Sequence, residues 1–416
     1  MLLFDYYGYK VATLQKIYIV VLYIDVYFVY LSCLLIELQI MNSPFQYGTI
    51  VSKESFVNRV EERKQLKELL GSGINVMLIS PRRWGKSSLV KVAMEELMQA
   101  EKNVRVCFID AFSIKTEVEF YRTFAREVIT SAASTLERRL EDVKHFLQGI
   151  SPSITLKSDS TDTLSFDLKF ELEERDIMEV LDLPEKIASA KGLRLIICID
   201  EFQQLAQLAG YKALEGKMRS VWQKQHQVSY CFYGSKRHIM MDIFNNSSNP
   251  FYRFGQVLFL QKIKKAEWIP FIVNSFHKTN KSISEQQAER LCDIVKCHSW
   301  YLQQLCYFIW SGTVDNVTDE IIEIRTRQLI DTNMPMFMND TENLTGPQTA
   351  MLRAIADGEY RFNSSAVVRK YELGSAQTIT RNKRMLAERD FIEKEGNKYI
   401  FSDPIFELWF RRDYCR

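Results

Sequence analysis

The segment Ser80-Pro-Arg-Arg-Trp-Gly-Lys-Ser87 constrains the fold of this chain more than any other part of the sequence. It follows a short apolar run, Asn75–Ile79, and precedes a helical pattern over Leu89–Leu97. The segment matches the phosphate-binding loop pattern G-x-x-x-x-G-K-[ST], except that Ser80 stands in place of the first glycine. A strand, this loop and a helix in that order predict an α/β nucleotide-binding domain.

The loop predicts which groups hold a nucleotide. Successive backbone N–H groups, backed by the N-terminus of the next helix, form a nest for phosphate. We expect Lys86 to reach the β- and γ-phosphates and the Ser87 hydroxyl to ligate Mg²⁺. The predicted nucleotide-binding residues are Ser80, Pro81, Arg82, Arg83, Trp84, Gly85, Lys86, Ser87 and Ser88.

A second motif supplies two acids. The run Leu193–Ile199 is apolar without interruption, as in a strand buried on both faces, and Asp200 and Glu201 follow it directly. Ligands of open α/β sheets bind beyond the carboxyl ends of the strands, so both carboxylates should face the phosphates. We expect Asp200 to hold magnesium through water, and Glu201 to polarise the attacking water as general base. The two motifs together predict Mg²⁺-dependent ATP hydrolysis.

Other residues are weaker candidates. Ser235 follows the strand Ser229–Tyr233, where it could sense the γ-phosphate or simply form a turn. Asp110 also ends a strand, and capping of a helix is its expected role. Arg237 and Arg253 are candidates for stabilising charge in the transition state, or are solvated surface arginines. His298 could approach the base or ribose, or be structural.

The remaining pattern predicts a parallel sheet followed by helices. Apolar strands at 104–109, 193–199, 229–233 and 257–260 alternate with helical segments. A β-hairpin, Ile154–Leu156 with Leu164–Leu172, interrupts the alternation. After Lys262 the pattern is helical, at Glu267–Phe276, Ser284–Lys296, Trp300–Trp310 and Asp319–Asp331. A linker is expected near Met334–Thr345, with Pro335, Asn339, Asn343 and Gly346.

The last segment predicts a winged helix-turn-helix. Helical patterns at 348–357, 364–371 and 376–389 precede two short strands, Phe391–Glu393 and Tyr399–Phe401. Its recognition helix is expected to present Thr378, Thr380, Arg381, Asn382, Lys383 and Arg384. Such a face suits DNA, through Thr378, Arg381, Lys383 and Arg384, but winged helices also dock proteins.

The N-terminus is apolar. Residues Ile17–Ile36 are long enough to cross a bilayer, yet Asp25 in their middle opposes insertion by roughly 2.5–3.5 kcal/mol. We expect residues 1–40 to be a dispensable extension or an over-extended start, with a membrane anchor as the alternative. A net charge of +2 provides no global field for nucleic acid or membrane. The eight cysteines lack paired spacing, which fits a reducing compartment; Cys292, Cys297 and His298 are too few for a zinc finger.

Five segments together resemble the archaeal-type ATPase family, an AAA-like, STAND-related group of P-loop ATPases. They are MNSPFQYGTIVSKESFVNR, ISPRRWGKSSL, LIICIDEFQQL, YCFYGSKRHIMMDIF and CHSWYLQQLCYFIW. The resemblance covers about Met41 to Asp331 and, more loosely, the winged helix. It implies a parallel sheet of the additional-strand type and a helical lid, and makes Met41 look like the natural start. It also implies Walker A roles for Lys86 and Ser87, Walker B roles for Asp200 and Glu201, and a sensor role for Ser235.

The expected organisation is therefore an extension at 1–40, a P-loop ATPase domain at 41–262, a helical lid at 263–333 and a winged helix at 346–416. We expect a slow, cytoplasmic ATPase that couples its nucleotide state to the winged helix. A homo-oligomer is a possible form of the protein. The alternatives are a nucleotide-gated DNA-binding regulator with structural ATP, and a membrane-tethered ATPase.

Overall fold

The computed structural model describes residues 43–49, 56–57, 59–132, 155–157, 167–169 and 174–415. Residues Phe45–Arg416 form one compact unit. The apolar run Ile17–Ile36 lies outside the described residues, so the expectations about it stay untested. None of the helices that are described combines the length and the hydropathy that crossing a bilayer requires.

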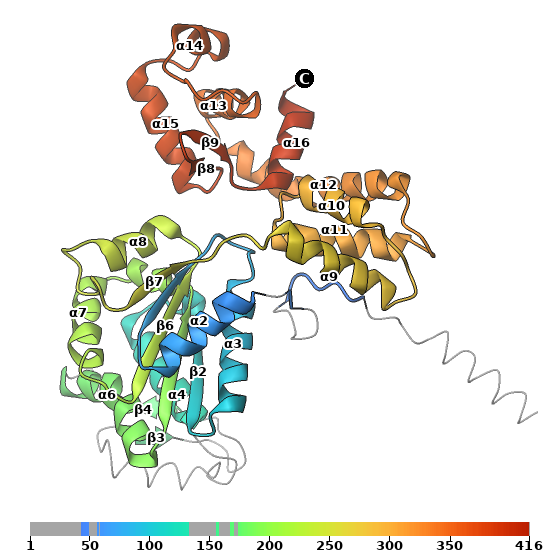
Figure 1. The fold of residues 1–416 in the computed structure, drawn as a ribbon. Helices are drawn as coiled ribbons and strands as arrows, with labels where there is room; N and C mark the ends of the chain where they lie inside the picture. The colour runs from blue at the N-terminus through green and yellow to red at the C-terminus, as the bar shows by residue number, and fades with distance from the viewer. Residues whose placement is uncertain are drawn as a thin grey trace, which may run out of the picture. The chain divides into compact units, whose positions relative to one another are not determined.

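Five parallel strands form the central sheet, in the order β2-β5-β6-β1-β7 (Figure 1). They are β1 (Val76–Ile79), β2 (Val104–Asp110), β5 (Arg194–Asp200), β6 (Val228–Gly234) and β7 (Gln256–Phe259). The strand β6 lies between β1, which leads into the phosphate-binding loop, and β5, which ends at Asp200 and is followed by Glu201. This is the additional-strand arrangement, so the expected fold class is confirmed.

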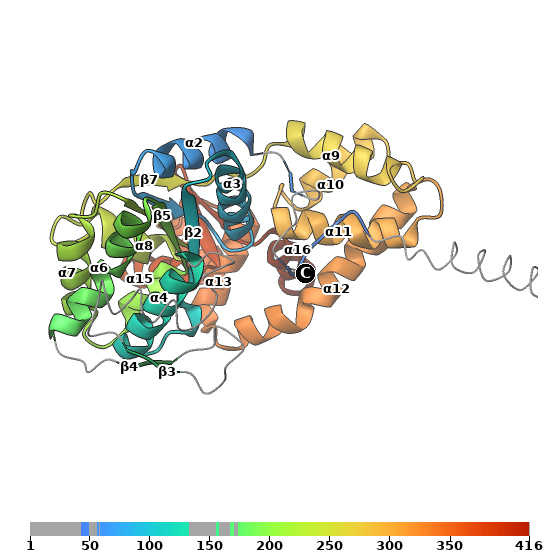
Figure 2. The ribbon, with the colours of Figure 1, turned by 90° about the horizontal axis from the view of Figure 1, so that it is seen from below.

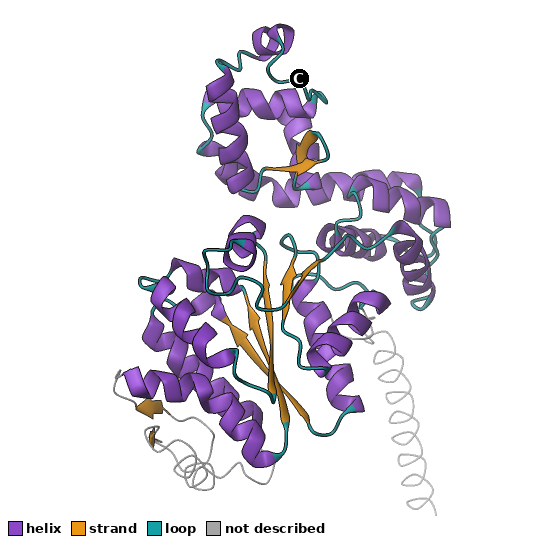
Figure 3. Ribbon diagram, turned by 60° about the vertical axis from the view of Figure 1, so that its left-hand side comes forward, coloured by secondary structure: helices purple, strands orange, loops and turns teal. Residues whose placement is uncertain are grey.

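Helices cover both faces of the sheet (Figure 3). One face packs against α4 (Glu117–Ala132), α6 (Glu174–Lys191), α7 (Tyr211–Trp222) and α8 (Arg237–Asn245), and the other against α2 (Val60–Gly71) and α3 (Lys86–Ala100). Successive residues of a strand point to opposite faces, so Ile197 and Ile199 enter the first core while Ile196 and Cys198 enter the second. Burial on both sides explains why the β5 segment is apolar throughout.

The predicted hairpin is present. β3 (Thr155–Lys157) and β4 (Asp167–Lys169) pair antiparallel just before α6. The residues that connect them lie outside the described part.

Four helices follow the sheet and pack against one another (Figure 2). They are α9 (Lys265–His277), α10 (Glu285–Ile294), α11 (Ser299–Gly312) and α12 (Asp319–Glu342). The predicted linker at Met334–Thr345 is wrong, because α12 continues through Pro335. Beyond the proline, Phe337 is buried, and its ring packs against Phe406 and Trp409. This burial outweighs the backbone hydrogen bond that the proline removes.

The winged helix has the predicted order of elements. It contains α13 (Gly346–Ala356), α14 (Ser365–Tyr371), α15 (Ala376–Glu388), β8 (Ile392–Glu395) and β9 (Lys398–Phe401). A further helix, α16 (Pro404–Tyr414), was not predicted. Its signal was nevertheless present in the sequence, since Asp403 caps its N-terminus and Pro404 occupies its first position. The helices α9 to α12 and the winged helix share a single hydrophobic core, so the predicted boundary between them is not a break in packing.

Candidate active site

The register of the parallel strands brings the predicted residues to one edge of the sheet. Ile79 pairs with Gly234, Asp110 pairs with Asp200, and Ile199 pairs with Phe232, so the strands β1, β2, β5 and β6 end close to the same level. The phosphate-binding loop, Ser235 and the acidic pair each begin where one of these strands ends. Residues far apart in the sequence therefore meet, as expected at the carboxyl ends of parallel strands.

The backbone of the loop explains why one glycine of the pattern is kept and the other is not. Gly85 has φ 85°, a left-handed conformation that favours glycine, and it is the N-cap of α3. Ser80 has no positive φ, so a side chain is tolerated there. Its hydroxyl donates to the Pro81 carbonyl at 3.0 Å, and its N–H donates to the Gly234 carbonyl at 3.3 Å.

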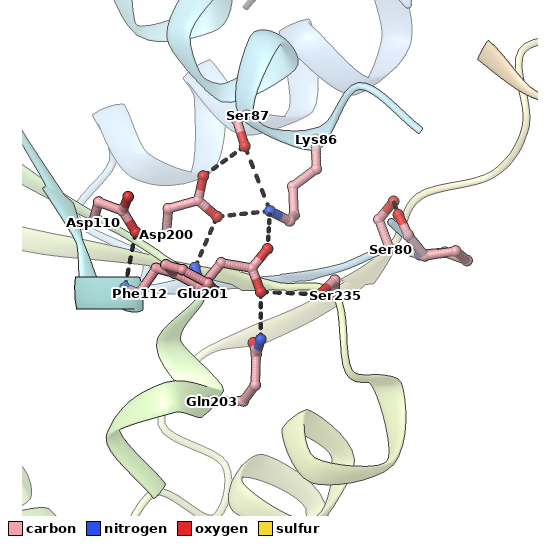
Figure 4. Close-up of polar contacts among 10 residues, drawn as sticks. Ser80, Lys86, Ser87, Asp110, Phe112, Asp200, Glu201, Gln203 and Ser235 are labelled. Carbon is pink, nitrogen blue, oxygen red and sulfur yellow. Dashed lines mark hydrogen bonds and ion pairs between the residues drawn. The ribbon is translucent and has the colours of Figure 1, made fainter. Parts of the chain in front are cut away.

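Lys86 and Ser87 both contact the acidic pair (Figure 4). The Lys86 Nζ lies 2.6 Å from Asp200 Oδ1 and 3.1 Å from Glu201 Oε1. The Ser87 hydroxyl donates to Asp200 Oδ2 at 2.5 Å. Lys86 is only 7% exposed, so its charge is held at the loop rather than in bulk water. The two motifs thus form a single cluster with one cation and two carboxylates.

Glu201 is held in a fixed position by its backbone and by three side chains. Its φ of 49° is left-handed, a strained conformation for a non-glycine residue and one that recurs at functional sites. Ser235 donates to Glu201 Oε2 at 2.9 Å, Gln203 donates to the same oxygen, and Lys86 donates to the other. Ser235 therefore lies within the cluster, where the sequence placed it.

The surroundings of Glu201 favour its ionised form. Burial raises the pKa of Glu201, but the charge of Lys86 and the hydrogen bonds from Gln203, Ser235 and Lys86 together hold it below the usual value. Glu201 is accordingly a carboxylate at neutral pH. An ionised carboxylate can accept a proton from water, as a general base must.

Gln203 is a member of the cluster that the sequence analysis missed. It is fully buried, and its amide is the third donor to Glu201. Gly234 makes room for it, because a Cβ added there would lie 1.9 Å from Gln203 Oε1. The sequence offered no local signal for this role, because the contact depends on how the turn after Glu201 folds back onto the strand end.

Arg59 is a second missed residue, and it supports the loop from outside. Its side chain is 2% exposed and donates to two main-chain carbonyls, those of Trp84 at 3.1 Å and Gln261 at 3.0 Å. Arg59 thereby ties the loop to the segment that follows β7. Its backbone is also left-handed, with φ 49°. An isolated arginine before a helix gave no sequence signal of this role.

The cluster also fits a magnesium ion. Mg²⁺ prefers oxygen ligands, typically one or two from the protein with the rest from water and phosphate. Ser87 Oγ and Asp200 Oδ2 are such oxygens, and they already lie within hydrogen-bonding distance of each other. These two residues would hold the ion, as the sequence predicted, and the ion would neutralise charge on the phosphates.

The weaker candidates lie elsewhere or have other contacts. Asp110 accepts a hydrogen bond from the Phe112 N–H at 2.9 Å, which confirms its capping role. Arg237 and Arg253 are exposed and lie over the rings of Phe259 and Tyr252. Neither arginine bonds to the cluster.

His298 is buried, and its Nδ1 has no hydrogen-bond partner among the described residues. Burial lowers its pKa to about 3, so the ring is neutral at physiological pH. Within the described ranges, no group of three or more side chains is arranged to hold a metal ion through His, Cys, Asp and Glu alone.

The predicted recognition helix α15 differs in part from expectation. Arg381 and Arg384 are exposed, but Asn382 is 3% exposed and belongs to the core, so its predicted outward role is wrong. It lies three residues from Ile379, on the face that this helix buries. Lys383 is half-buried over the rings of Phe362 and Tyr399. Fewer side chains of α15 are therefore available to contact a partner than the sequence predicted.

Comparisons with known proteins agree with this architecture. Residues 56–305 match the family described as an ATPase domain predominantly from Archaea, and residues 335–412 match a probable winged helix domain. A comparison with curated proteins finds no match. A Walker-type ATPase of Pyrococcus abyssi is 19% identical and superposes with a TM-score of 0.64, over 88% of this chain and 99% of that one. The ORC2 protein of Aeropyrum pernix, solved as ADPNP–ADP complexes, is 12% identical with a TM-score of 0.55, over 90% and 99%. At these identities the solved structures show the shared fold.

Proposed function

The chain belongs to the family of ATPase domains predominantly from Archaea, and on this premise we propose that it binds Mg²⁺–ATP, hydrolyses it slowly and couples its nucleotide state to the winged helix. The observation that carries the proposal is the cluster of Lys86, Ser87, Asp200 and Glu201, in which both loop side chains contact the acidic pair. The amides of the loop and Lys86 bind the phosphates. Ser87 and Asp200 hold the metal ion, and Glu201 takes a proton from the attacking water.

The proposed slow rate of hydrolysis rests on the positions of the arginine side chains. An arginine that neutralises the transferring phosphoryl group accelerates P-loop hydrolysis by roughly 10³- to 10⁵-fold. Within the described part of the chain, no arginine side chain bonds to Lys86, Ser87, Asp200 or Glu201. An arginine from a partner protein or from a second copy of the chain would then accelerate the reaction. Slow turnover suits a switch that resets rather than a motor.

The coupling to the winged helix rests on the shared core of lid and winged helix. Because α11, α12 and α16 are packed in one hydrophobic cluster, a lid movement over the nucleotide carries the winged helix with it. We place the protein in the cytoplasm, where ATP and Mg²⁺ are abundant; the buried free thiols of Cys107, Cys198 and Cys231 fit a reducing compartment.

Removing magnesium tests the proposed chemistry. Phosphate release from ATP by the full chain should fall by roughly 100-fold or more when Mg²⁺ is chelated, because charge on the phosphates is no longer neutralised. Excess Mg²⁺ should restore the rate. A circular dichroism spectrum taken with the chelator shows whether the chain stays folded. Phosphate release that continues at the same rate in chelator would overturn the proposal.

A second candidate function is a DNA-binding regulator in which nucleotide gates the winged helix. The exposed Arg381 and Arg384 on α15 favour it, since arginines on such a helix contact phosphates and base edges.

The DNA-binding candidate predicts a specific salt effect. Replacing Arg381 and Arg384 together with alanine should reduce the slope of log K against log salt for duplex DNA by about two, as expected for two lost phosphate contacts. Fluorescence anisotropy over a salt series measures this slope. Lys224→Ala with Lys278→Ala is the matched control, because both lysines are exposed and lie outside the winged helix. An unchanged slope in the arginine variant would exclude α15 as the DNA contact.

A further inference from the structure

Arg83 of the phosphate-binding loop reaches the lid. Its Nη1 donates to the Tyr301 hydroxyl at 3.3 Å, and its Cζ lies 5.1 Å from the centre of the Trp300 ring. Its other terminal nitrogen lies 3.8 Å from the Met336 sulfur on α12. The backbone of Arg83 is left-handed, with φ 66°, and this conformation belongs to the loop that cradles phosphate. One side chain of the loop therefore bonds to two lid helices.

Tyr301 continues this contact into the winged helix. It is fully buried, and its hydroxyl donates to Asp403 Oδ2 at 2.5 Å. The other oxygen of Asp403 caps α16 by accepting from the N–H groups of Ile405 and Phe406, both at 2.9 Å. A single tyrosine hydroxyl thus links a cation of the loop to an anion at the start of the last helix. Burial raises the pKa of Asp403, and the hydrogen bond from Tyr301 opposes this rise by favouring the ionised carboxylate.

The lid and the winged helix are joined by further ion pairs. Lys296 lies 2.5 Å from Glu407, and Arg412 lies 2.7 Å from Asp331. Together with the shared core, these contacts make the two parts respond as one body. The bond between Arg83 and this body therefore depends on where the lid and the winged helix lie relative to the phosphate-binding loop.

Cations on and near the phosphate-binding loop also interact with acidic residues of the winged helix. Burial raises the pKa of Asp390, whereas the charges of Arg82 and Lys236 oppose that rise. Burial also raises the pKa of Glu393, against the charges of Lys262 and Arg237. Two acids of the winged helix thus feel cations from the loop and from the segments after β6 and β7. A triphosphate is itself a polyanion and would draw on the same cations.

We propose that Arg83, Tyr301 and Asp403 form a latch between the phosphate-binding loop and the body made of lid and winged helix, and that a bound triphosphate opens this latch by competing for the Arg83 guanidinium. The inference rests on the proposed function, because it requires that the loop bind ATP. It adds the route by which nucleotide binding reaches the winged helix.

The competition favours phosphate. A guanidinium forms charge-assisted, often bidentate hydrogen bonds with phosphate, which are roughly twice as strong as a bond to a neutral hydroxyl. When Arg83 turns to phosphate, Tyr301 keeps Asp403 but loses its link to the loop. Linkage then requires that breaking the latch by mutation tightens nucleotide binding by the factor with which nucleotide weakens the latch.

Two substitutions test the latch in the full chain. Tyr301→Phe removes the hydroxyl and keeps the ring, while Asp403→Asn keeps an oxygen for capping α16 and removes the charge. Each should bind the non-hydrolysable analogue AMP-PNP with Mg²⁺ about 3- to 30-fold more tightly than wild type, measured by calorimetry. A substitution that merely loosens the structure does not tighten binding. Tyr307→Phe is the matched control, since Tyr307 lies on the same helix and its ring packs on Tyr47.

Hydrogen exchange provides the second readout. In wild type, Mg²⁺–AMP-PNP should raise amide exchange in the first turn of α11 by roughly 10-fold, because the latch no longer restrains it. In Tyr301→Phe this exchange should be high already, and the analogue should add little. If wild type binds the analogue but both variants bind it with wild-type affinity, the latch is wrong while the proposed function stands. If wild type does not bind the analogue, the proposed function fails first.

Discussion

Replacing Glu201 with glutamine is expected to lower phosphate release by about 100-fold or more while Mg²⁺–ATP binding stays within a few-fold of wild type. Glutamine keeps the shape of the side chain, and its amide oxygen can still accept from Ser235 and Gln203. It cannot take a proton from water, so only the chemical step should suffer. The measurement is phosphate release under single-turnover conditions, together with a binding titration of the same variant.

Asp110→Asn is the matched control for this substitution. Asp110 ends the neighbouring strand and pairs in register with Asp200, so the control changes the same chemical group at the same edge of the sheet. Because its carboxylate only caps a short helical turn, the rate should stay within a few-fold of wild type. A Glu201→Gln variant as fast as this control would remove Glu201 from the mechanism.

Lys86→Ala should weaken Mg²⁺–ATP binding by roughly 100-fold or more. The substitution removes the cation expected to grip the β- and γ-phosphates. It also leaves Asp200 and Glu201 without the ammonium group that lies 2.6 and 3.1 Å from them. Two unpaired carboxylates then repel the triphosphate in addition. Displacement of a fluorescent ATP analogue measures the affinity.

The control for Lys86→Ala is Lys91→Ala. Lys91 lies on the same helix, α3, and its side chain is exposed. Its loss should change the affinity by less than a few-fold, since an exposed charge beyond the loop is screened by solvent and salt. Equal affinities of the two variants for Mg²⁺–ATP would contradict the assignment of Lys86.

The sequence contained most of the site because its chemistry follows strand ends. A loop pattern after β1 and an acidic pair after β5 are each local signals, and the rule that parallel strands end at one edge brings them together. Ser235 could be placed for the same reason. Gln203 and Arg59 could not, because their contacts depend on how a short turn and a distant helix start fold back onto the cluster.

The helices and strands could be predicted where the periodic pattern of apolar residues decides the structure. The prediction failed where tertiary packing overrides a local sequence rule. Pro335 looks like a helix end, yet Phe337 beyond it is buried against the winged helix, and α12 continues. Asn382 looks like a surface residue of a recognition helix, yet it lies on the buried face of α15. In both cases tertiary contacts decided the outcome, and a single sequence does not contain them explicitly.

Calorimetric titration of Mg²⁺–ATP into the purified full chain tests the central claim most directly. Main-chain amides and one ammonium group should bind the triphosphate at one site per chain, with a measurable heat that disappears in Lys86→Ala. A folded wild-type chain that releases no binding heat at any temperature tried, and does not displace a fluorescent nucleotide, would contradict the account.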